Sequence, residues 1–161
     1  GDILMQESVA LDKDMNSIDL TLKLTNLGKK ILMKTLPLLF ENKLTSKKQD
    51  ESKVTYANKF MSEDRKINFY NSSDDVLNHI RAHGPKPGSW FIYKGERIKI
   101  IKAKKINKSG ESSTILNKDF MIACKDGAIL PMLIQREGKN VVSLDDFLRG
   151  FTFSIYDKLN A

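Results

Sequence analysis

The chain has 161 residues, enough for one ordinary domain or two small ones. With 40% hydrophobic and 29% charged residues, the composition excludes a disordered chain, and no apolar run reaches the roughly 18 to 20 residues that cross a bilayer. A single cysteine, Cys124, excludes an intrachain disulfide and a multi-cysteine zinc site, and with only two histidines we expect no metal centre. The sequence has no signal-like segment, and we expect a cytoplasmic protein.

The net charge of +7 is concentrated in one part of the chain. Between Arg81 and Lys108 stand nine basic residues and a single acidic one, Glu96, so this stretch alone carries +8. Such a local basic patch is typical of proteins that bind a polyanion, and nucleic acid is the favoured partner. Charge alone leaves open a solvated lysine-rich strand without a partner, or an acidic lipid or protein partner.

Residues 1–45 are expected to form the tail of an α/β unit. The short apolar run of residues 3–11 predicts a strand. Asn16 or Ser17 can then cap the first turn of a helix, and Asp19 is placed to favour that turn electrostatically.

The expected helix carries an apolar face. Spacings of four, three and four residues place on one side Leu20, Leu24, Leu27 and Ile31. Gly28 is expected to break or kink the helix, and Pro37 to disturb its last part. One strand and one or two helices cannot bury this face, so we expect a partner sheet to cover it. A self-contained helical hairpin is the alternative.

Residues 46–69 have the polar composition of a linker between domains. Val54, Tyr56 and Phe60 are embedded in this polar stretch and indicate that the linker is pinned to a surface.

Two helices are predicted from their capping residues. Ser72 and Ser143 each stand three residues before an aspartate, which is the spacing of a capping box. The first helix should run over residues 72–82, because the two prolines and two glycines of residues 84–88 leave no helical option. The second should be short and end near Gly150.

From Ser89 onward the signal changes to short strands separated by turns. The apolar runs cover residues 89–93, 97–106, 113–116, 120–124 and 128–135. Short strands at this density predict a small closed barrel or a sandwich. Pro131 is expected at an edge or at a bulge.

The strand predicted at residues 97–106 changes phase along its length. Arg97 and Lys99 occupy odd positions, whereas Lys102 and Lys104 occupy even ones. Because side chains alternate along a strand, keeping the bases outward requires a bulge near Ile100. With the bulge, one outer face would carry Arg97, Lys99, Lys102 and Lys104. This face would be roughly 20 to 25 Å long, which matches the length of several consecutive phosphates of a nucleic acid.

Four segments stand out by their order and spacing. The first is Gly-Asp-Ile-Leu-Met-Gln at residues 1–6, and the second is Gln-Asp-Glu-Ser-Lys-Val-Thr-Tyr-Ala-Asn-Lys at residues 49–59. The third joins Ile-Arg-Ala at residues 80–82 to Pro-Lys-Pro-Gly-Ser-Trp at residues 85–90, and the fourth is spread over residues 135–148. Together they resemble the C-terminal half of the methionyl-tRNA formyltransferase family over nearly the whole chain.

The resemblance implies an α+β fragment. It would consist of the tail of a Rossmann-like α/β formyltransferase domain (residues 1–45), a linker (residues 46–69) and an OB-like β-barrel domain that binds tRNA (residues 70–161). The whole enzyme would transfer a formyl group from 10-formyltetrahydrofolate to the amine of methionyl-initiator tRNA, and we expect a monomer.

The family's catalytic asparagine, histidine and aspartate belong to its N-terminal domain, upstream of the position that Gly1 matches. The resemblance therefore implies no catalytic residue in this chain, and we expect the chain alone to be inactive. His79 and His83 are interpreted as ordinary helix-end or surface histidines.

The candidate RNA-binding residues have two sources. The resemblance implies Lys59 and Lys66 at basic linker positions, where Arg65 adds a further charge. It also implies Arg81, which either binds RNA or ties the helix to the barrel. Charge and periodicity, rather than any motif, indicate Arg97, Lys99, Lys102 and Lys104, and the charge count of the basic stretch adds Lys86. Trp90 is interpreted as a core residue rather than a platform on which bases stack.

Two other functions fit the sequence. One is a stand-alone OB-like RNA-binding module, which the leucine-rich face of residues 18–40 argues against because that face needs a covering sheet. The other is a formyltransferase whose acceptor is a sugar nucleotide or another small amine. The +8 stretch favours a phosphate-rich acceptor, and RNA above all.

Overall fold

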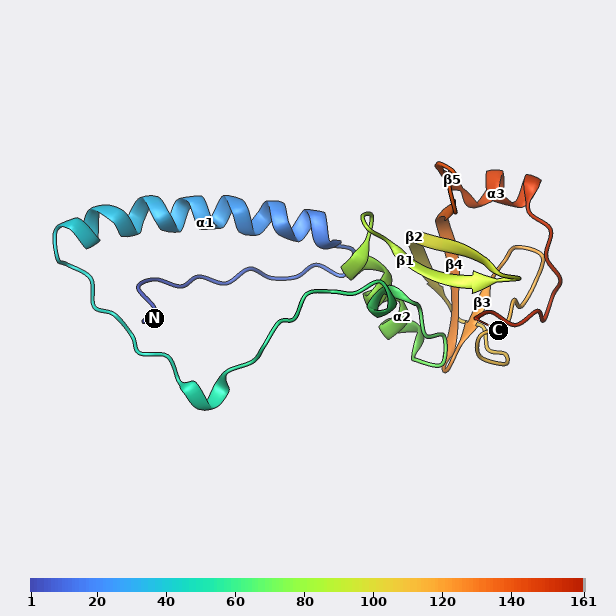
Figure 1. Ribbon diagram of the computed structural model, residues 1–161, viewed down its shortest axis with the longest axis horizontal. Coiled ribbons are helices and arrows are strands. Elements are labelled where there is room, and N and C mark those ends of the chain that lie inside the picture. The colour runs from blue at the N-terminus through green and yellow to red at the C-terminus, as the bar shows by residue number, and fades with distance from the viewer. Residues whose placement is uncertain (161) are drawn as a thin grey trace. The chain divides into compact units, whose positions relative to one another are not determined.

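A computed structural model describes residues 1–160 of the chain (Figure 1). The chain divides into two units, Gly1–Lys59 and a second that begins at Phe60. In chain order the elements are α1 (Ser17–Phe40), the 3-10 helices η1 (Glu51–Lys53) and η2 (Glu63–Arg65), α2 (Ser73–His83), β1 (Ser89–Tyr93), β2 (Glu96–Ile106), β3 (Ile122–Cys124), β4 (Gly127–Arg136), β5 (Val141–Ser143) and α3 (Leu144–Gly150).

Helix α1 begins at the predicted capping residues. Asn16 Oδ1 accepts a hydrogen bond from the Asp19 amide (3.1 Å), and Asp19 Oδ2 accepts one from the Asn16 amide (3.2 Å). The helix continues through Gly28 and Pro37 to Phe40, so the predicted break at Gly28 is wrong. A single glycine costs a helix only about 1 kcal/mol relative to alanine, which is not enough to end it.

The strand predicted at residues 3–11 is also wrong. In Figure 1 the N-terminal segment runs extended beside α1, and ion pairs join the two, such as Lys23 with Asp12 (2.9 Å). Its backbone pairing is limited to a bridge between Ile3 and Lys47. Without a neighbouring strand to bond with, the segment forms no sheet, and the Rossmann-like tail is not confirmed.

The apolar face of α1 is only partly covered by the first unit. Leu27 and Ile31 are half-buried, whereas Leu24 is exposed. More apolar side chains of this helix also face solvent, among them Leu22, Leu32, Met33 and Phe40. Residues 1–59 contain one α-helix rather than the alternative helical hairpin.

The second unit is built on an antiparallel sheet, which confirms the α+β class. Its strand order is β1-β2-β4-β3, with β5 also paired to β4. Strand β1 has the predicted bounds, while residues 113–116 form isolated bridges rather than a strand and β5 was not predicted.

The predicted closed barrel is not confirmed, because no strand ladder within residues 1–160 joins β1 to β3. Irregular segments lie along these two edges instead. The Ser113 amide donates to the Ala123 carbonyl of β3 (2.9 Å), the Leu159 amide to the Ser113 carbonyl (2.8 Å), and the Asn160 amide to the Ile92 carbonyl of β1 (2.8 Å). Left-handed backbone at Ser113 (φ 67°) and Asn160 (φ 61°) prevents these segments from continuing as strands.

The bulge predicted near Ile100 is confirmed. The register between β2 and β4 shifts on both sides of Lys102, which leaves Ile101 and Met132 without paired residues. Pro131 lies next to the second shift, as expected for a residue that cannot donate a ladder hydrogen bond.

Both predicted helix caps in the second unit are confirmed. Ser72 Oγ accepts a hydrogen bond from the Asp75 amide (3.0 Å), and Ser143 Oγ accepts one from the Asp146 amide (3.2 Å). Helix α3 ends at Gly150, as predicted.

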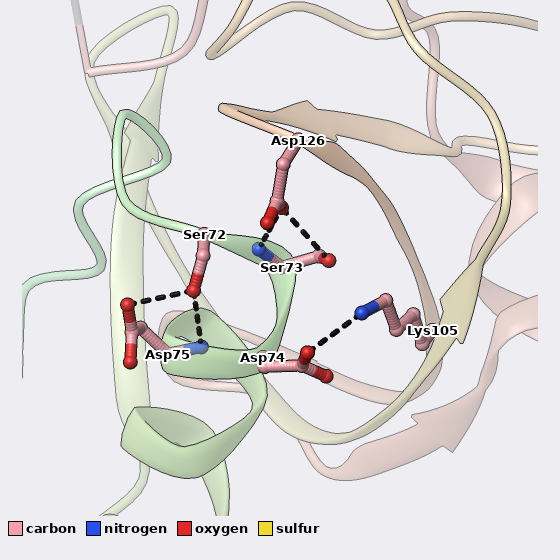
Figure 2. A network of polar contacts seen from close by, with 6 residues as sticks. All are labelled: Ser72, Ser73, Asp74, Asp75, Lys105 and Asp126. Atoms are coloured by element: carbon pink, nitrogen blue, oxygen red, sulfur yellow. Dashed lines mark hydrogen bonds and ion pairs between the residues drawn. The ribbon is translucent and has the colours of Figure 1, made fainter.

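A polar network holds the start of α2 against the sheet (Figure 2). Asp126, in the turn between β3 and β4, accepts hydrogen bonds from the amide (2.7 Å) and the hydroxyl (3.1 Å) of Ser73. The hydrogen bond from the Ser73 backbone amide is the main reason that the pKa of Asp126 is lowered. Lys105 of β2 pairs with Asp74 at 2.7 Å, so its charge is neutralised by the helix.

Asp157 attaches the C-terminal segment to β1. Its Oδ2 accepts a hydrogen bond from the Tyr93 hydroxyl (2.5 Å) and pairs with Lys94 Nζ (3.1 Å). These contacts lower the pKa of Asp157, and the hydrogen bond from the Tyr93 hydroxyl has the largest effect. Since the pKa is lower in the folded state, the carboxylate stabilises the fold above the unfolded-state pKa of about 3.9. This contribution is lost as the pH falls through that value toward the folded-state pKa.

We therefore expect Asp157→Asn to lower the melting temperature at neutral pH and to flatten its acid dependence. Circular dichroism melts of both proteins between about pH 7 and pH 3 measure this difference. A variant whose melting temperature falls with acid as steeply as that of the wild type would contradict the role of Asp157.

Candidate nucleic-acid interface

The basic residues predicted on β2 lie on its outer face. Ile98 and Ile100 are fully buried in the core, so the side chains that alternate with them point away from it. Across the ladder to β4, basic residues pair with partners that are themselves partly or fully exposed, namely Lys99 with Gln135, Lys102 with Leu133 and Lys104 with Leu130. The bulge thus keeps both halves of the basic row on one surface, which we call the outer face.

Within the described residues, carboxylates do not neutralise the cations of the outer face. Lys94 and Lys105, which the charge count included, pair with Asp157 and Asp74 and lie apart from this row. Within residues 1–160 no ion pair involves the side chains of Lys66, Lys86, Arg97, Lys99, Lys102 or Lys104. Their charges remain available to a partner.

The turn of residues 84–88 packs against the bulge of β2. A Cβ atom at Gly84 would lie 3.1 Å from the Ile101 carbonyl oxygen, and one at Gly88 would lie 3.3 Å from Lys99 Cδ. A Cβ atom at Gly84 would also lie only 2.9 Å from the Ile80 carbonyl oxygen, and Gly88 has a left-handed φ of 84°, so both positions favour glycine. The turn therefore lies beside Lys99 at Gly88, and it also carries the exposed Lys86.

Trp90 and its neighbours were only partly predicted. Trp90 is 3% exposed, as expected of a core residue, yet it lies outside the main hydrophobic cluster. The Arg97 guanidinium carbon is 4.0 Å and Lys66 Nζ is 5.8 Å from the centroid of its ring. The two-residue turn at 94–95 sets the hairpin register that pairs Trp90 with Lys99. This turn was the sequence signal from which the position of Trp90 among the basic residues of β2 could have been predicted.

The remaining candidates lie elsewhere. Arg65 is half-buried in η2, and Arg81 Nε donates to Asn78 Oδ1 on α2 (3.0 Å). Lys59 is exposed and belongs to the first unit, so it is described separately from the outer face.

His83 ends α2 and His79 lies one turn earlier in the same helix; both are half-buried. His83 Nδ1 lies 3.0 Å from the His79 carbonyl oxygen, and burial is the main cause of a lowered pKa at His79. No three metal-binding side chains gather anywhere in the described part of the chain. Within residues 1–160, no helix is both long enough and apolar enough to span a bilayer.

Residues 59–152 match the family described as formyl transferase, C-terminal domain. The chain belongs to this family. Methionyl-tRNA formyltransferases from Rickettsia bellii (35% identity, 99% of this chain and 52% of the relative) and Pelagibacter ubique (33% identity, 84% and 44%) are similar to it. The chain spans about half the length of the curated relatives it matches, and the resemblance inferred from its four segments is confirmed.

Two solved structures share the fold of this chain. HypX from Aquifex aeolicus superposes with a TM-score of 0.68 at 17% identity, covering 93% of this chain and 29% of HypX. An N-formyltransferase from Helicobacter canadensis, solved with folinic acid and dTDP-3-aminofucose, superposes with a TM-score of 0.63 at 24% identity. The match covers 84% of this chain and 50% of that enzyme. At these identities the likeness concerns the fold alone.

A cavity of about 720 Å³ lies in the first unit, preceding the matched domain. Its lining includes Lys47, Lys48, Asp50 and Lys53, and no aromatic side chain. Of its lining residues Ile3 and Val54 are apolar, which is too little apolar surface to enclose the flat ring system of a folate. We therefore assign no residue of this chain to the formyl donor.

Proposed function

We propose that this chain is the tRNA-binding part of a methionyl-tRNA formyltransferase. Curated relatives of that name at 33–36% identity support the assignment. The observation that carries it is the outer face, whose cations no carboxylate within residues 1–160 neutralises. A surface of this kind attracts a phosphate-rich partner.

In this proposal the whole protein, a cytoplasmic monomer, transfers a formyl group from 10-formyltetrahydrofolate to the methionyl amine of initiator tRNA. Residues 1–45 belong to its Rossmann-like catalytic domain, an assignment that the exposed apolar side chains of α1 support. Residues 46–69 are the linker. The second unit derives from an OB-like barrel in which irregular segments lie along β1 and β3.

The outer face binds the RNA backbone and not its bases. Lysine ammonium groups are point charges that neutralise phosphates without demanding one geometry. Such contacts fix the position and orientation of a nucleic acid but do not read its sequence. The share of this chain in the reaction is therefore to hold the tRNA while other residues of the enzyme carry out the transfer.

The salt dependence of tRNA binding tests this function. Each neutralised phosphate contributes about 0.7 to 0.9 to the slope of log affinity against log salt, so the four cations of β2 predict a slope of roughly 3. Fluorescence anisotropy of the chain with labelled initiator tRNA, over a series of salt concentrations, measures it.

A dTDP-sugar titrated under the same conditions is the matched comparison for a small acceptor. Its two phosphates can contribute about half that slope at most. Tight binding of the dTDP-sugar together with weak, salt-insensitive binding of tRNA would overturn the proposed acceptor.

A further inference from the structure

Trp90 is buried on the side of the sheet that faces away from the core. Its neighbour Phe91 is fully buried in the hydrophobic cluster, and alternation along β1 turns Trp90 to the opposite face. There it pairs in register with Lys99. Its indole Nε1 donates to the Ser62 carbonyl (3.0 Å), so the ring also anchors the segment that leads into η2.

Two cations share the ring of Trp90. The Arg97 guanidinium carbon is 4.0 Å from the ring centroid and Lys66 Nζ is 5.8 Å from it, so these atoms are at most 9.8 Å apart. The backbone fixes this arrangement, since Lys66 forms a bridge with Trp90 and the Ile67 amide donates to the Trp90 carbonyl (2.7 Å). Two positive charges from segments far apart in sequence are thus held at one place.

Nearby carboxylates do not neutralise this pair of cations. Glu96 accepts two hydrogen bonds from Arg136, at 2.7 and 2.8 Å. Asp64 accepts a hydrogen bond from the Met61 amide (2.7 Å). Glu63 makes no ion pair with Lys66 or Arg97. At a separation of at most 9.8 Å the two charges lie within about a Debye length of each other at 0.1 M salt, so they repel, and a bound anion would relieve the repulsion.

We propose that Lys66 and Arg97, held by Trp90, form a clamp for one phosphate group of the RNA backbone. Stacking on an aromatic ring fixes the plane of a guanidinium and leaves its N–H groups to bind an anion, while lysine adds a point charge. Trp90 is then a positioning residue, because it sets the geometry of both cations without touching the phosphate. That the phosphate belongs to RNA rests on the proposed function.

Trp90 is the single tryptophan of the chain, so its fluorescence reports on the clamp directly. We expect its emission to change when the full chain is titrated with initiator tRNA or with inorganic pyrophosphate. Arg97→Gln should abolish the response to pyrophosphate, lower tRNA affinity about fourfold to fivefold at 0.15 M salt, and reduce the salt slope by about 0.7 to 0.9. Lys139→Gln, in an exposed turn between β4 and β5, is the matched control and should change neither.

The positioning role is tested by substituting the ring itself. Trp90→Phe keeps an aromatic face and should retain most of the tRNA affinity, whereas Trp90→Leu should lose as much as Arg97→Gln. Circular dichroism melts establish that both variants are folded. Because both changes disable one clamp, the double variant Trp90→Leu with Arg97→Gln should lose little more than either single variant.

The outcomes separate the clamp from the proposed function. If tRNA binds but Arg97→Gln binds it as tightly as the wild type, or if the losses at Trp90 and Arg97 multiply, the clamp is overturned and the function stands. If tRNA does not bind at all, the proposed function falls. The pyrophosphate titration then decides alone, and an unchanged Trp90 emission overturns the clamp as well.

Discussion

Replacing Lys99, Lys102 and Lys104 together by glutamine is expected to lower the affinity of the chain for initiator tRNA by about 50-fold or more at 0.15 M salt. At a slope of about 0.7 to 0.9 per phosphate, each contact contributes roughly fourfold to fivefold under these conditions. The three lysines lie on one face and have no ion pair within residues 1–160, so their charges are free to act on the RNA. Anisotropy titrations with labelled tRNA measure the loss.

A second triple variant controls for net charge. Lys118, Lys125 and Lys139 are exposed lysines in turns outside β2, and their replacement by glutamine removes the same charge. We expect a loss of less than about fivefold, since distant charges are screened at this salt concentration. Equal losses in the two triple variants would mean that total charge, and not the outer face, determines binding.

The fold could be predicted where local signals decide it. The turn at residues 94–95 and the phase change near Ile100 are sufficient to define the hairpin and the bulge of β2. The strand expected at residues 113–116 is wrong, because apolar composition does not reveal the left-handed backbone at Ser113. The strand expected at residues 3–11 failed for another reason, namely that a strand needs a neighbour and composition does not show whether one exists.

The candidate site was predictable to the extent that it follows one strand. Alternation along β2 placed its basic residues on one face, but counting charges along the chain overestimated the patch. Lys94 is neutralised by Asp157 and Lys105 by Asp74, partners that are distant in sequence. The position of Lys66 over Trp90 depends on the packing of η2 against β1, which no local pattern contains.

Phe120→Ala is expected to lower the free energy of unfolding by about 3 to 5 kcal/mol, the largest stability effect that we predict. Phe120 is fully buried and lies at the centre of an aromatic cluster. Its ring centroid is 4.9 Å from that of Phe153 and 5.3 Å from that of Phe147, so its loss would leave a cavity between α3 and the sheet. Urea denaturation followed by circular dichroism measures the change.

Two further variants separate ring packing from backbone strain at this position. Phe120 has a left-handed φ of 59°. Alanine at this φ has a backbone strain of about 1 kcal/mol or more, whereas glycine adopts the same φ without strain. Phe120→Gly should therefore be at least as stable as Phe120→Ala, the reverse of the usual order in regular structure. Phe60→Ala removes a ring that is 72% exposed and should cost less than about 1 kcal/mol. A loss at Phe120 no larger than that at Phe60 would show that the aromatic cluster does not hold the sheet and α3 together.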